Sequence, residues 1–254
     1  MIYITGDCHS DFDRFSTRIF TEQKEMTKDD TVIICGDFGG IWYQEDSVYI
    51  RRENYELNYL EEKPFTTVFV DGNHENFDRL NSFPIKEWNG GLVHEIRPSV
   101  LHLIRGEVYT IEGKKFFAFG GARSHDISDG ILDYADEDWK EKAKALDKQG
   151  KYMYRIKGLS WWEQELPTEE EMQNGIENLK KHNNKVDFII THSPSASVVA
   201  LLGQGLYEQD VLTRYLEDVR CNIEYTRMFS GHMHIDRQIN DKDILLYEQI
   251  VRIN

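Results

Sequence analysis

The chain has 254 residues, of which 40% are hydrophobic and 12% aromatic, as in a folded globular protein rather than a disordered one. Its formal net charge of −15 argues against tight, sequence-independent binding of long nucleic acid, which requires a dense basic surface. The charge does not exclude a small phosphorylated substrate, because bound metal ions can reverse the local field.

The cysteines and the first residues bear on the cellular compartment. Cys8, Cys35 and Cys221 are odd in number and lack C-x-x-C spacing, so we expect a reducing compartment and no disulfide framework. No apolar run approaches the ~20 residues of a membrane span. The opening MIYITGDCHS has neither the basic nor the long apolar segment of a leader. We therefore expect a cytoplasmic location; the sequence does not indicate the oligomeric state.

Short apolar runs alternate with amphipathic stretches along most of the chain. Unbroken apolar runs predict strands buried on both faces, here residues 1–5, 31–37, 66–74, 186–194 and 227–234. Charged stretches with spaced apolar residues predict helices over 46–62, 168–182 and 207–219. The second helix begins with Thr168 as N-cap and Glu171 three residues on. This alternation predicts an α/β fold.

Three segments depart from that alternation. Residues 92–121 hold β-rich pieces separated by RGE and EGKK turns, which predict an antiparallel meander. Residues 243–253 predict one last strand. Residues 124–167 mix charges with aromatic side chains and contain no strong strand run. We expect residues 124–167 to form an irregular surface insertion that serves as a cap over a functional site. The whole chain, residues 1–254, is expected to be one domain.

Each of the five apolar runs ends in side chains that can bind metal ions. Sites in open α/β sheets form outside the carboxyl ends of the strands, so these side chains are expected to converge. The candidate ligands are Asp7, His9, Asp37, Asn73, His192, His232 and His234, with His74 beside them. The spacing of Asp7 and His9, and of His232 and His234, places each pair on one side of an extended segment.

The chemistry of this set favours two metal ions. Nitrogen and oxygen donors without a thiolate suit Mn, Fe, Zn or Co rather than a structural cysteine-bound zinc. Seven ligands are too many for one ion and suit two that share a bridging carboxylate. Two ions roughly 3.5–4 Å apart can clamp the attacking and leaving oxygens of a displacement at phosphorus.

Five short motifs occur in a characteristic order: GDCH at 6–9, GD at 36–37, GNHE at 72–75, THS at 191–193 and GHMH at 231–234. Together they resemble the motifs of the calcineurin-like metallophosphoesterases, and they extend over nearly the whole chain. The resemblance implies two packed mixed β-sheets flanked by helices, a four-layer αββα sandwich. It also implies two divalent metal ions, such as Mn, Fe, Zn, Co or Ni, with Mn expected to serve in vitro.

The resemblance implies a role for each motif residue. Asp7, His9 and His234 would bind the first metal ion. The second would be bound by Asn73, His192 and His232, and Asp37 would bridge both. His74 would face the phosphate as general acid, and a hydroxide bridging the metals would be the nucleophile. The implied activity is hydrolysis of a small phosphorylated mono- or diester, with nucleotides among the candidate substrates.

Departures from the family pattern narrow the alternatives. Ser10 occupies a position that is usually glycine, which permits a sharp turn. The V-D-R-G motif of the Ser/Thr protein phosphatases is missing, and Asp71-Gly72 replaces their arginine before the third motif. A protein phosphatase is therefore disfavoured. A nuclease that uses the same site and a non-catalytic metal-binding scaffold remain as alternatives.

Residues outside the motifs have weaker signals. Arg123 and His125 follow a Gly-Gly pair at a strand end, so they are candidate substrate contacts. Trp161 and Trp162 could stack a nucleobase, but we favour a role in pinning the insertion to the core. We expect His94 and His102 to be ordinary surface or strand histidines, and Cys8 and Cys35 to be buried as small apolar residues. The candidates for orienting a ligand histidine are Asp11, Asp71, Glu75 and Asp78.

Overall fold

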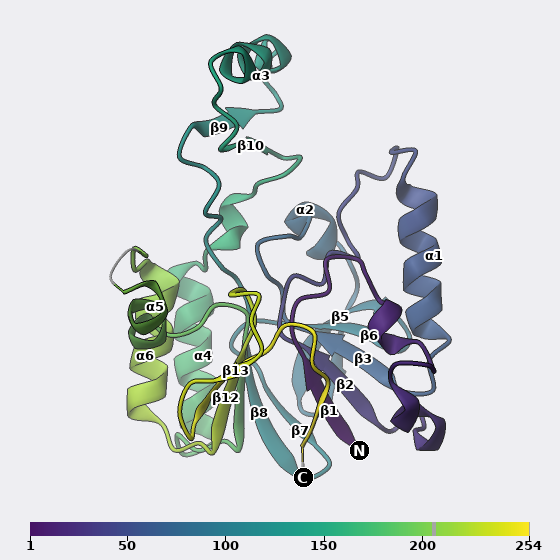
Figure 1. Cartoon of the computed structure of the whole chain (residues 1–254). Coiled ribbons are helices and arrows are strands. Elements are labelled where there is room, and N and C mark those ends of the chain that lie inside the picture. The colour runs from purple at the N-terminus through teal and green to yellow at the C-terminus, as the bar shows by residue number, and fades with distance from the viewer. Residues whose placement is uncertain (205–206, 254) are drawn as a thin grey trace.

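The strands form two mixed sheets that pack face to face in a computed structural model, which describes residues 1–204 and 207–253 (Figure 1). The first sheet has the order β15 (Val251–Ile253), β1 (Ile2–Thr5), β2 (Thr31–Ile34), β3 (Thr66–Phe69), β6 (Val100–Leu103), β5 (Gly91–Arg97) and β4 (Ile85–Trp88). The second has the order β13 (Arg237–Gln238), β14 (Asp243–Leu245), β12 (Arg227–Ser230), β11 (Phe188–Thr191), β8 (Lys114–Phe119) and β7 (Val108–Ile111). Each contains four neighbouring parallel strands.

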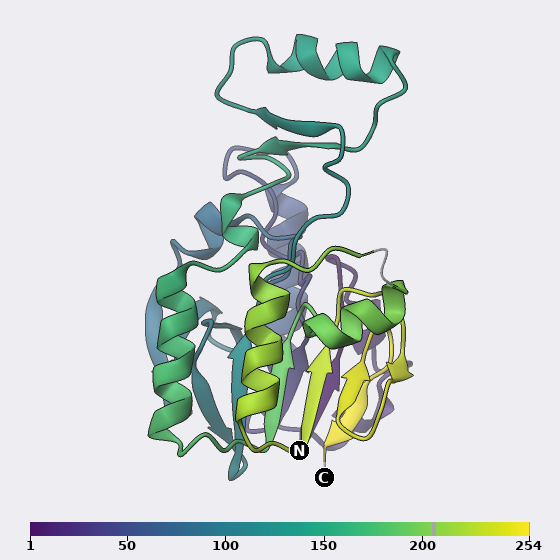
Figure 2. The same ribbon diagram turned by 90° about the vertical axis from the view of Figure 1, so that its left-hand side faces the viewer.

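Helices cover the two outer faces of this pair of sheets. The α-helices of the body are α1 (Ile50–Glu61), α2 (Phe77–Leu80), α4 (Glu169–Lys181), α5 (Ala196–Gly203) and α6 (Val211–Asn222). Helix α1 packs on the first sheet, whereas α4 and α6 lie side by side over the second (Figure 2). The order of layers is therefore helix, sheet, sheet, helix, as expected from the sequence.

Successive side chains of the central strands enter different hydrophobic cores. Ile33 of β2 packs between the sheets in a core that includes Phe229 of β12. Its neighbour Ile34 packs on the opposite face with Leu57 of α1. Both isoleucines are fully buried. Strands with two buried faces need apolar residues at consecutive positions, which explains the unbroken runs in the sequence.

The predicted strands and helices are confirmed, with altered bounds. Helix α1 begins later than expected, and α6 begins at Val211 rather than at 207. Both α4 and α6 begin with a capping box, formed by Thr168 with Glu171 and by Asp210 with Thr213. The sequence does not predict the capping box of α6, because Thr213 occupies the position where Glu or Gln is usual. Helix α5 was not predicted.

Two β predictions were wrong in their connections. Residues 92–121 do not form one meander, since β5 and β6 pair in the first sheet whereas β7 and β8 pair in the second. Residues 243–253 are likewise two strands, with β14 in the second sheet and β15 beside β1 in the first. Both segments cross between sheets that face each other, and local sequence patterns do not encode such a crossing.

The insertion is more regular than expected, and it stands away from the body. Strands β9 (Gly130–Asp133) and β10 (Tyr154–Lys157) pair in parallel, with α3 (Trp139–Lys148) between them in the chain. Figures 1 and 2 show this unit as a projecting arm rather than a layer on the domain surface. We refer to residues 126–161 as the arm. Its strands have only four residues each and are half exposed, so they carry little apolar signal.

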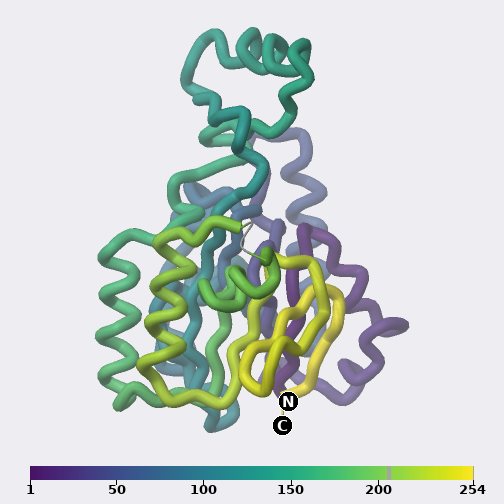
Figure 3. The backbone as a smooth tube through the Cα atoms, turned by 60° about the vertical axis from the view of Figure 1, so that its left-hand side comes forward, coloured from purple at the N-terminus to yellow at the C-terminus, as the bar shows by residue number. Residues whose placement is uncertain are grey.

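The two ends of the described chain lie together at the edge opposite the arm (Figure 3). Strand β15 pairs antiparallel with β1, and Ile253 faces Ile2. Among the described residues, no helix combines the length and apolar character needed to cross a membrane.

Adjacent residues of β2 provide a test of the double-sided core. Replacing Ile33 or Ile34 with alanine should each lower the free energy of unfolding by about 2–5 kcal/mol, because each leaves a cavity in a separate core. Urea denaturation measures both changes. Ile85→Ala is the control, since Ile85 is 59% exposed, and it should change stability by at most about 0.5 kcal/mol. A small effect at either β2 position would contradict burial on that face.

Candidate metal centre

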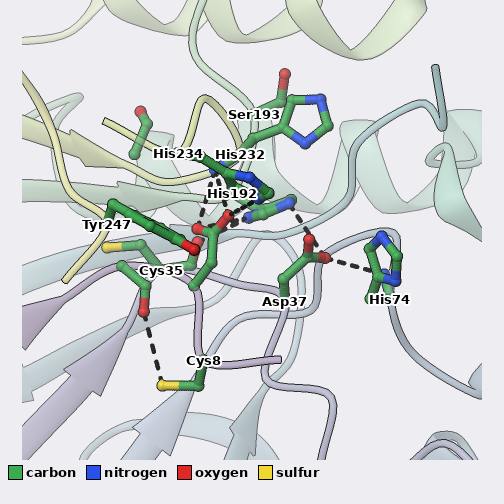
Figure 4. A network of polar contacts seen from close by, with 12 residues as sticks. Cys8, Cys35, Asp37, His74, His192, Ser193, His232, His234 and Tyr247 are labelled. Atoms are coloured by element: carbon green, nitrogen blue, oxygen red, sulfur yellow. Dashed lines mark hydrogen bonds and ion pairs between the residues drawn. The ribbon is translucent and has the colours of Figure 1, made fainter. Parts of the chain in front are cut away.

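The candidate ligands converge where the carboxyl ends of the parallel strands of both sheets meet. Asp7 follows β1, Asp37 follows β2 and Asn73 follows β3, whereas His192 follows β11 and His232 follows β12. The three first-sheet strands are neighbours, and so are the two second-sheet strands. The site therefore lies across the seam between the sheets (Figure 4).

One group of four residues forms the first half of the site. Asp7, His9, Asp37 and His234 each place a potential ligand atom within 4.8 Å of the others. His234 Nε2 lies 3.2 Å from Asp7 Oδ2, and His9 Nε2 lies 3.7 Å from Asp37 Oδ2. The His9 and His234 Nε2 atoms are 3.1 Å apart. This close approach of two imidazole nitrogens and two carboxylates suits a shared cation.

A second group shares Asp37 with the first. Asp37, His192 and His232 also place ligand atoms within 4.8 Å of one another. His192 Nε2 lies 3.2 Å from Asp37 Oδ1, and in Figure 4 Asp37 lies between His192 and His74. Each group contains residues that the sequence resemblance assigns to one metal ion, although Asn73 is not part of the second group, and Asp37 is common to both.

Unsatisfied polar atoms support metal binding at the second group. Asn73 Oδ1 is buried and has no hydrogen-bond partner among the described residues, and His192 Nε2 faces Asp37 Oδ1 at 3.2 Å without hydrogen-bond geometry. Buried polar atoms without partners are costly, and a bound cation would satisfy both. His192 Nδ1 lies 2.8 Å from the Cys35 carbonyl, to which it donates, and this leaves Nε2 as the atom that can bind metal.

The sequence matches the calcineurin-like phosphoesterase family over residues 1–236. The chain belongs to this family. Family members are classed as metal-dependent phosphoric ester hydrolases, and the two ligand groups fit that class.

Individual relatives are more distant. The chain is 29% identical to lariat debranching enzyme A of Xenopus laevis over 140 residues, and 25% identical to the human lariat debranching enzyme over 140 residues. The enzyme of Danio rerio is 26% identical over 144 residues. These matches cover 51%, 51% and 52% of the chain but only 25%, 24% and 24% of the respective relatives. The matched part thus spans about a quarter of their length.

Electrostatics in this phosphoesterase site couple protons to metal binding. Burial lowers the pKa of His192, but the adjacent carboxylates of Asp37 and Asp7 outweigh burial and raise it to about 10. Burial raises the pKa of Asp37, but His192 and the other histidines bring it well below its usual value. A metal ion must displace the proton of His192 to bind Nε2, so metal binding should release protons.

The glycines of the family motifs leave room for ligand side chains. A Cβ at Gly36 would lie 2.3 Å from the His192 ring, and a Cβ at Gly72 would lie 2.0 Å from Asp37 Oδ1. At Gly231 it would lie 2.1 Å from Asp7 Oδ1. Any larger residue would displace the ligand that it touches, which explains why glycine precedes the ligand in these motifs.

The ligand loops are tight turns rather than the extended segments expected from the sequence. His9, Asp37, His232 and His234 all have left-handed backbone conformations, with φ of +47°, +41°, +65° and +49°. Such conformations cost about 1–3 kcal/mol each in non-glycine residues and cluster at functional sites. Ser10 also has a left-handed backbone conformation, with φ of +64°. Glycine, which the family pattern has at this position, adopts this conformation more easily.

His74 lies at the rim of the ligand cluster. Its backbone N–H donates to Asp37 Oδ1 at 2.9 Å, and its ring centroid lies 5.0 Å from that of His9. The Trp42 ring stacks on His74 at 5.7 Å. Burial lowers the pKa of His74, although Asp37 opposes this shift. A histidine with a lowered pKa is a strong proton donor when it is protonated.

Of the two predicted substrate contacts, only His125 reaches the ligands. Its Nε2 lies 2.8 Å from His232 Nε2. Arg123 lines the same cavity, of about 310 Å³, but its side chain is 46% exposed and pairs with Glu208 at 3.6 Å. The pair thus combines an exposed histidine that contacts a candidate ligand with a cation at the rim of the cavity.

The four carboxylates proposed to orient ligand histidines have other partners. Asp11 accepts from the Asp13 backbone, and Glu75 accepts from the Phe38 and Gly39 N–H groups after Asp37. Asp71 pairs with Arg105 and His102, and Asp78 accepts from Trp162 Nε1 at 2.9 Å. The ligand His192 is oriented instead by a backbone carbonyl, which sequence cannot indicate.

His94 and His102 are strand histidines but not surface ones. They are 6% and 4% exposed, and their Nδ1 atoms lie 2.9 Å apart. His102 Nε2 lies 3.1 Å from Asp71 Oδ1. Burial lowers the pKa of His94 to about 4. They belong to a buried polar network that supports the strand before Asn73.

The predictions for Cys8, Cys35 and Trp162 are confirmed, whereas that for Trp161 is not. Cys8 and Cys35 are buried, and burial raises the pKa of Cys8 to about 12, so it is a poor nucleophile. Trp162 is 3% exposed and packs edge-on against Trp42, which pins the base of the arm to the core. Trp161 is half-buried and forms a β-bridge with Lys157 within the arm.

Three residues near the site carried no recognisable signal in the sequence. Tyr247 stacks on the His234 ring at 4.9 Å (Figure 4). Ser124 and Glu165 are buried at the two ends of the arm, and the Ser124 N–H donates to Glu165 Oε2 at 3.1 Å. Burial raises the pKa of Glu165 to about 8.

The raised pKa of Glu165 predicts a pH-dependent stability. The Glu165 carboxyl has a pKa near 4.5 in the unfolded state, so the folded state binds its proton more tightly. The contribution of protonated Glu165 to the free energy of unfolding is therefore complete below pH 4.5. It decreases as the pH rises to about 8. The difference in unfolding free energy between wild type and Glu165→Gln should fall by up to about 1.4 kcal/mol per pH unit in that window. Urea denaturation across the window measures it, and a constant difference would contradict the prediction.

Proposed function

We propose that the chain is a dinuclear metal-dependent phosphodiesterase that acts on a small phosphodiester such as a nucleotide ester. The observation that carries this proposal is the pair of ligand groups sharing Asp37. Asn73 Oδ1, which has no hydrogen-bond partner within residues 1–204 and 207–253, adds a ligand of the kind expected beside His192 and His232.

In this proposal the residues divide between two ions. Asp7, His9 and His234 hold the first ion with Asp37. Asp37 also holds the second ion, together with Asn73, His192 and His232. When bound, two divalent ions lower the pKa of water and neutralise charge that develops on the phosphoryl oxygens.

His74 acts as the proton donor to the leaving oxygen. Asp37 accepts its backbone N–H, and Trp42 stacks on its ring, so both fix the imidazole at the rim of the cluster. A positioned acid of this kind typically contributes 10²–10⁴-fold to the rate. His125, beside His232, contacts the phosphate or the group attached to it.

Two cavities favour a diester over a monoester. The cavity of about 310 Å³ is lined by His232 and His125. Another of about 170 Å³ is lined by His9, His74 and Trp42. Each ligand group therefore has a cavity beside it, and a diester carries two substituents that need such space.

A second candidate is a nuclease that acts at a branch point. The observation that favours it is the similarity to proteins named as lariat debranching enzymes. Opening a lariat with a phosphoesterase implies cleavage of a phosphodiester at the branch. The net charge of −15 favours the small substrate over a long one, and the exposed arginines considered for a long substrate are only a pair on α1, Arg51 and Arg52, and Arg123 before the arm.

The substrate class can be tested with model esters. The wild-type protein loaded with Mn²⁺ should hydrolyse a bis-aryl phosphodiester with a higher kcat/KM than the corresponding aryl phosphate monoester. The comparison should be repeated with Zn²⁺, Co²⁺, Ni²⁺ and Fe²⁺, and with a dinucleotide and a branched oligonucleotide. A preference for the monoester would overturn the diester assignment, and selective cleavage of the branched substrate would favour the second candidate.

The bridging and acid roles predict opposite phenotypes. Asp37→Asn should reduce binding to fewer than two Mn²⁺ ions, because both groups lose a shared charged ligand. His74→Ala should retain both ions but lower kcat by about 10²–10⁴-fold, with the largest loss for poor leaving groups. Calorimetric titration with Mn²⁺ and steady-state kinetics distinguish them. His182→Ala, at the end of α4, is the matched control. Loss of a metal ion in His74→Ala would contradict its role.

A further inference from the structure

The arm is closed at its base by a buried contact between its two ends. Ser124 lies just before the arm and is 1% exposed, whereas Glu165 lies just after it and is 2% exposed. Glu165 Oε2 accepts the Ser124 backbone N–H at 3.1 Å. We call this contact the clasp.

The clasp touches a candidate metal ligand. Asn73 Nδ2 donates to Ser124 Oγ at 3.3 Å. The other end of the amide, Oδ1, is buried without a hydrogen-bond partner in the described part of the chain. An amide can bind a metal only through its oxygen, so the direction in which the Asn73 amide points decides whether the residue is a ligand.

Glu165 fixes the position of Ser124 through the backbone. Its Oε2 accepts the Ser124 N–H, which holds the serine beside Asn73. From this position the Ser124 hydroxyl oxygen accepts from Asn73 Nδ2, and this leaves Oδ1 as the end of the amide that can bind a metal ion.

A purely structural role explains Glu165 less well. Its Oε1 has no hydrogen-bond partner among the described residues, and the nearby Arg155 pairs with Asp126 instead. A buried carboxyl group without a cation lowers stability relative to an apolar side chain of similar size. Such costly groups are retained mainly at functional sites.

We propose that Ser124 and Glu165 are positioning residues that hold the Asn73 amide oxygen toward the second metal ion. The proposal rests on the proposed metal-binding role of Asn73. It also implies that the base of the arm is connected to the metal centre through two successive hydrogen bonds, so a change in the clasp alters one metal site selectively.

Calorimetric titration with Mn²⁺ tests this proposal independently of activity. Ser124→Ala and Glu165→Ala should each weaken one of two Mn²⁺ sites by about 10–100-fold and leave the other unchanged. Glu165→Gln should bind nearly as wild type, because its amide oxygen can still accept from Ser124. The double variant Ser124→Ala/Asn73→Ala should bind no more weakly than Asn73→Ala alone, since both act on one interaction.

Matched controls separate positioning from general damage. Ser128→Ala and Glu163→Ala change exposed residues near the same segment and should keep both sites. Thermal melting identifies variants that do not fold. If Glu165→Ala does not fold, the Mn²⁺ titration of Ser124→Ala alone tests the proposal. Wild-type affinity at both sites in Ser124→Ala would overturn the proposal, as would additive losses with Asn73→Ala. Two bound Mn²⁺ ions without hydrolysis of any phosphodiester would instead overturn the proposed function.

Discussion

Two carboxylates, Asp7 and Asp37, are buried next to each other at the seam between the sheets, and this placement constrains the rest of the site. They are 0% and 1% exposed. Buried charges are stable only when hydrogen bonds and opposite charges surround them. The backbone N–H of His232 donates to Asp7, and those of Asn73 and His74 donate to Asp37. His232 and the acceptor Asp37 have left-handed backbone conformations, so the ligand loops are arranged around the carboxylates.

The sequence predicted the parts of the molecule that depend on local signals. The apolar runs of the central strands reflect burial on two faces, which Ile33 and Ile34 illustrate. The capping box of Thr168 and Glu171 marked the start of α4. Each ligand follows a strand directly, so motif order and the convergence of parallel strands sufficed to bring the candidate metal residues together.

The failed predictions concern partners that are distant in the chain. Whether β7 joins the sheet of β6 or the opposite sheet depends on pairing with β8, and the sequence of residues 92–121 fits either. His102 and Glu165 are buried because other segments cover them, and neither has a burial signal in its local sequence. The orientation of His192 by the Cys35 carbonyl is likewise invisible, since a backbone group has no sequence signature.

The clasp also bears on how this chain could diversify. Because Ser124 and Glu165 join the two ends of the arm, the residues between them form a loop whose closure free energy depends only weakly on their number. Doubling the length of a flexible loop costs only about 0.6 kcal/mol. The arm can thus be lengthened, shortened or replaced during evolution without moving the candidate metal ligands. The length of the arm and the hydrolytic chemistry would then evolve on separate parts of one polypeptide.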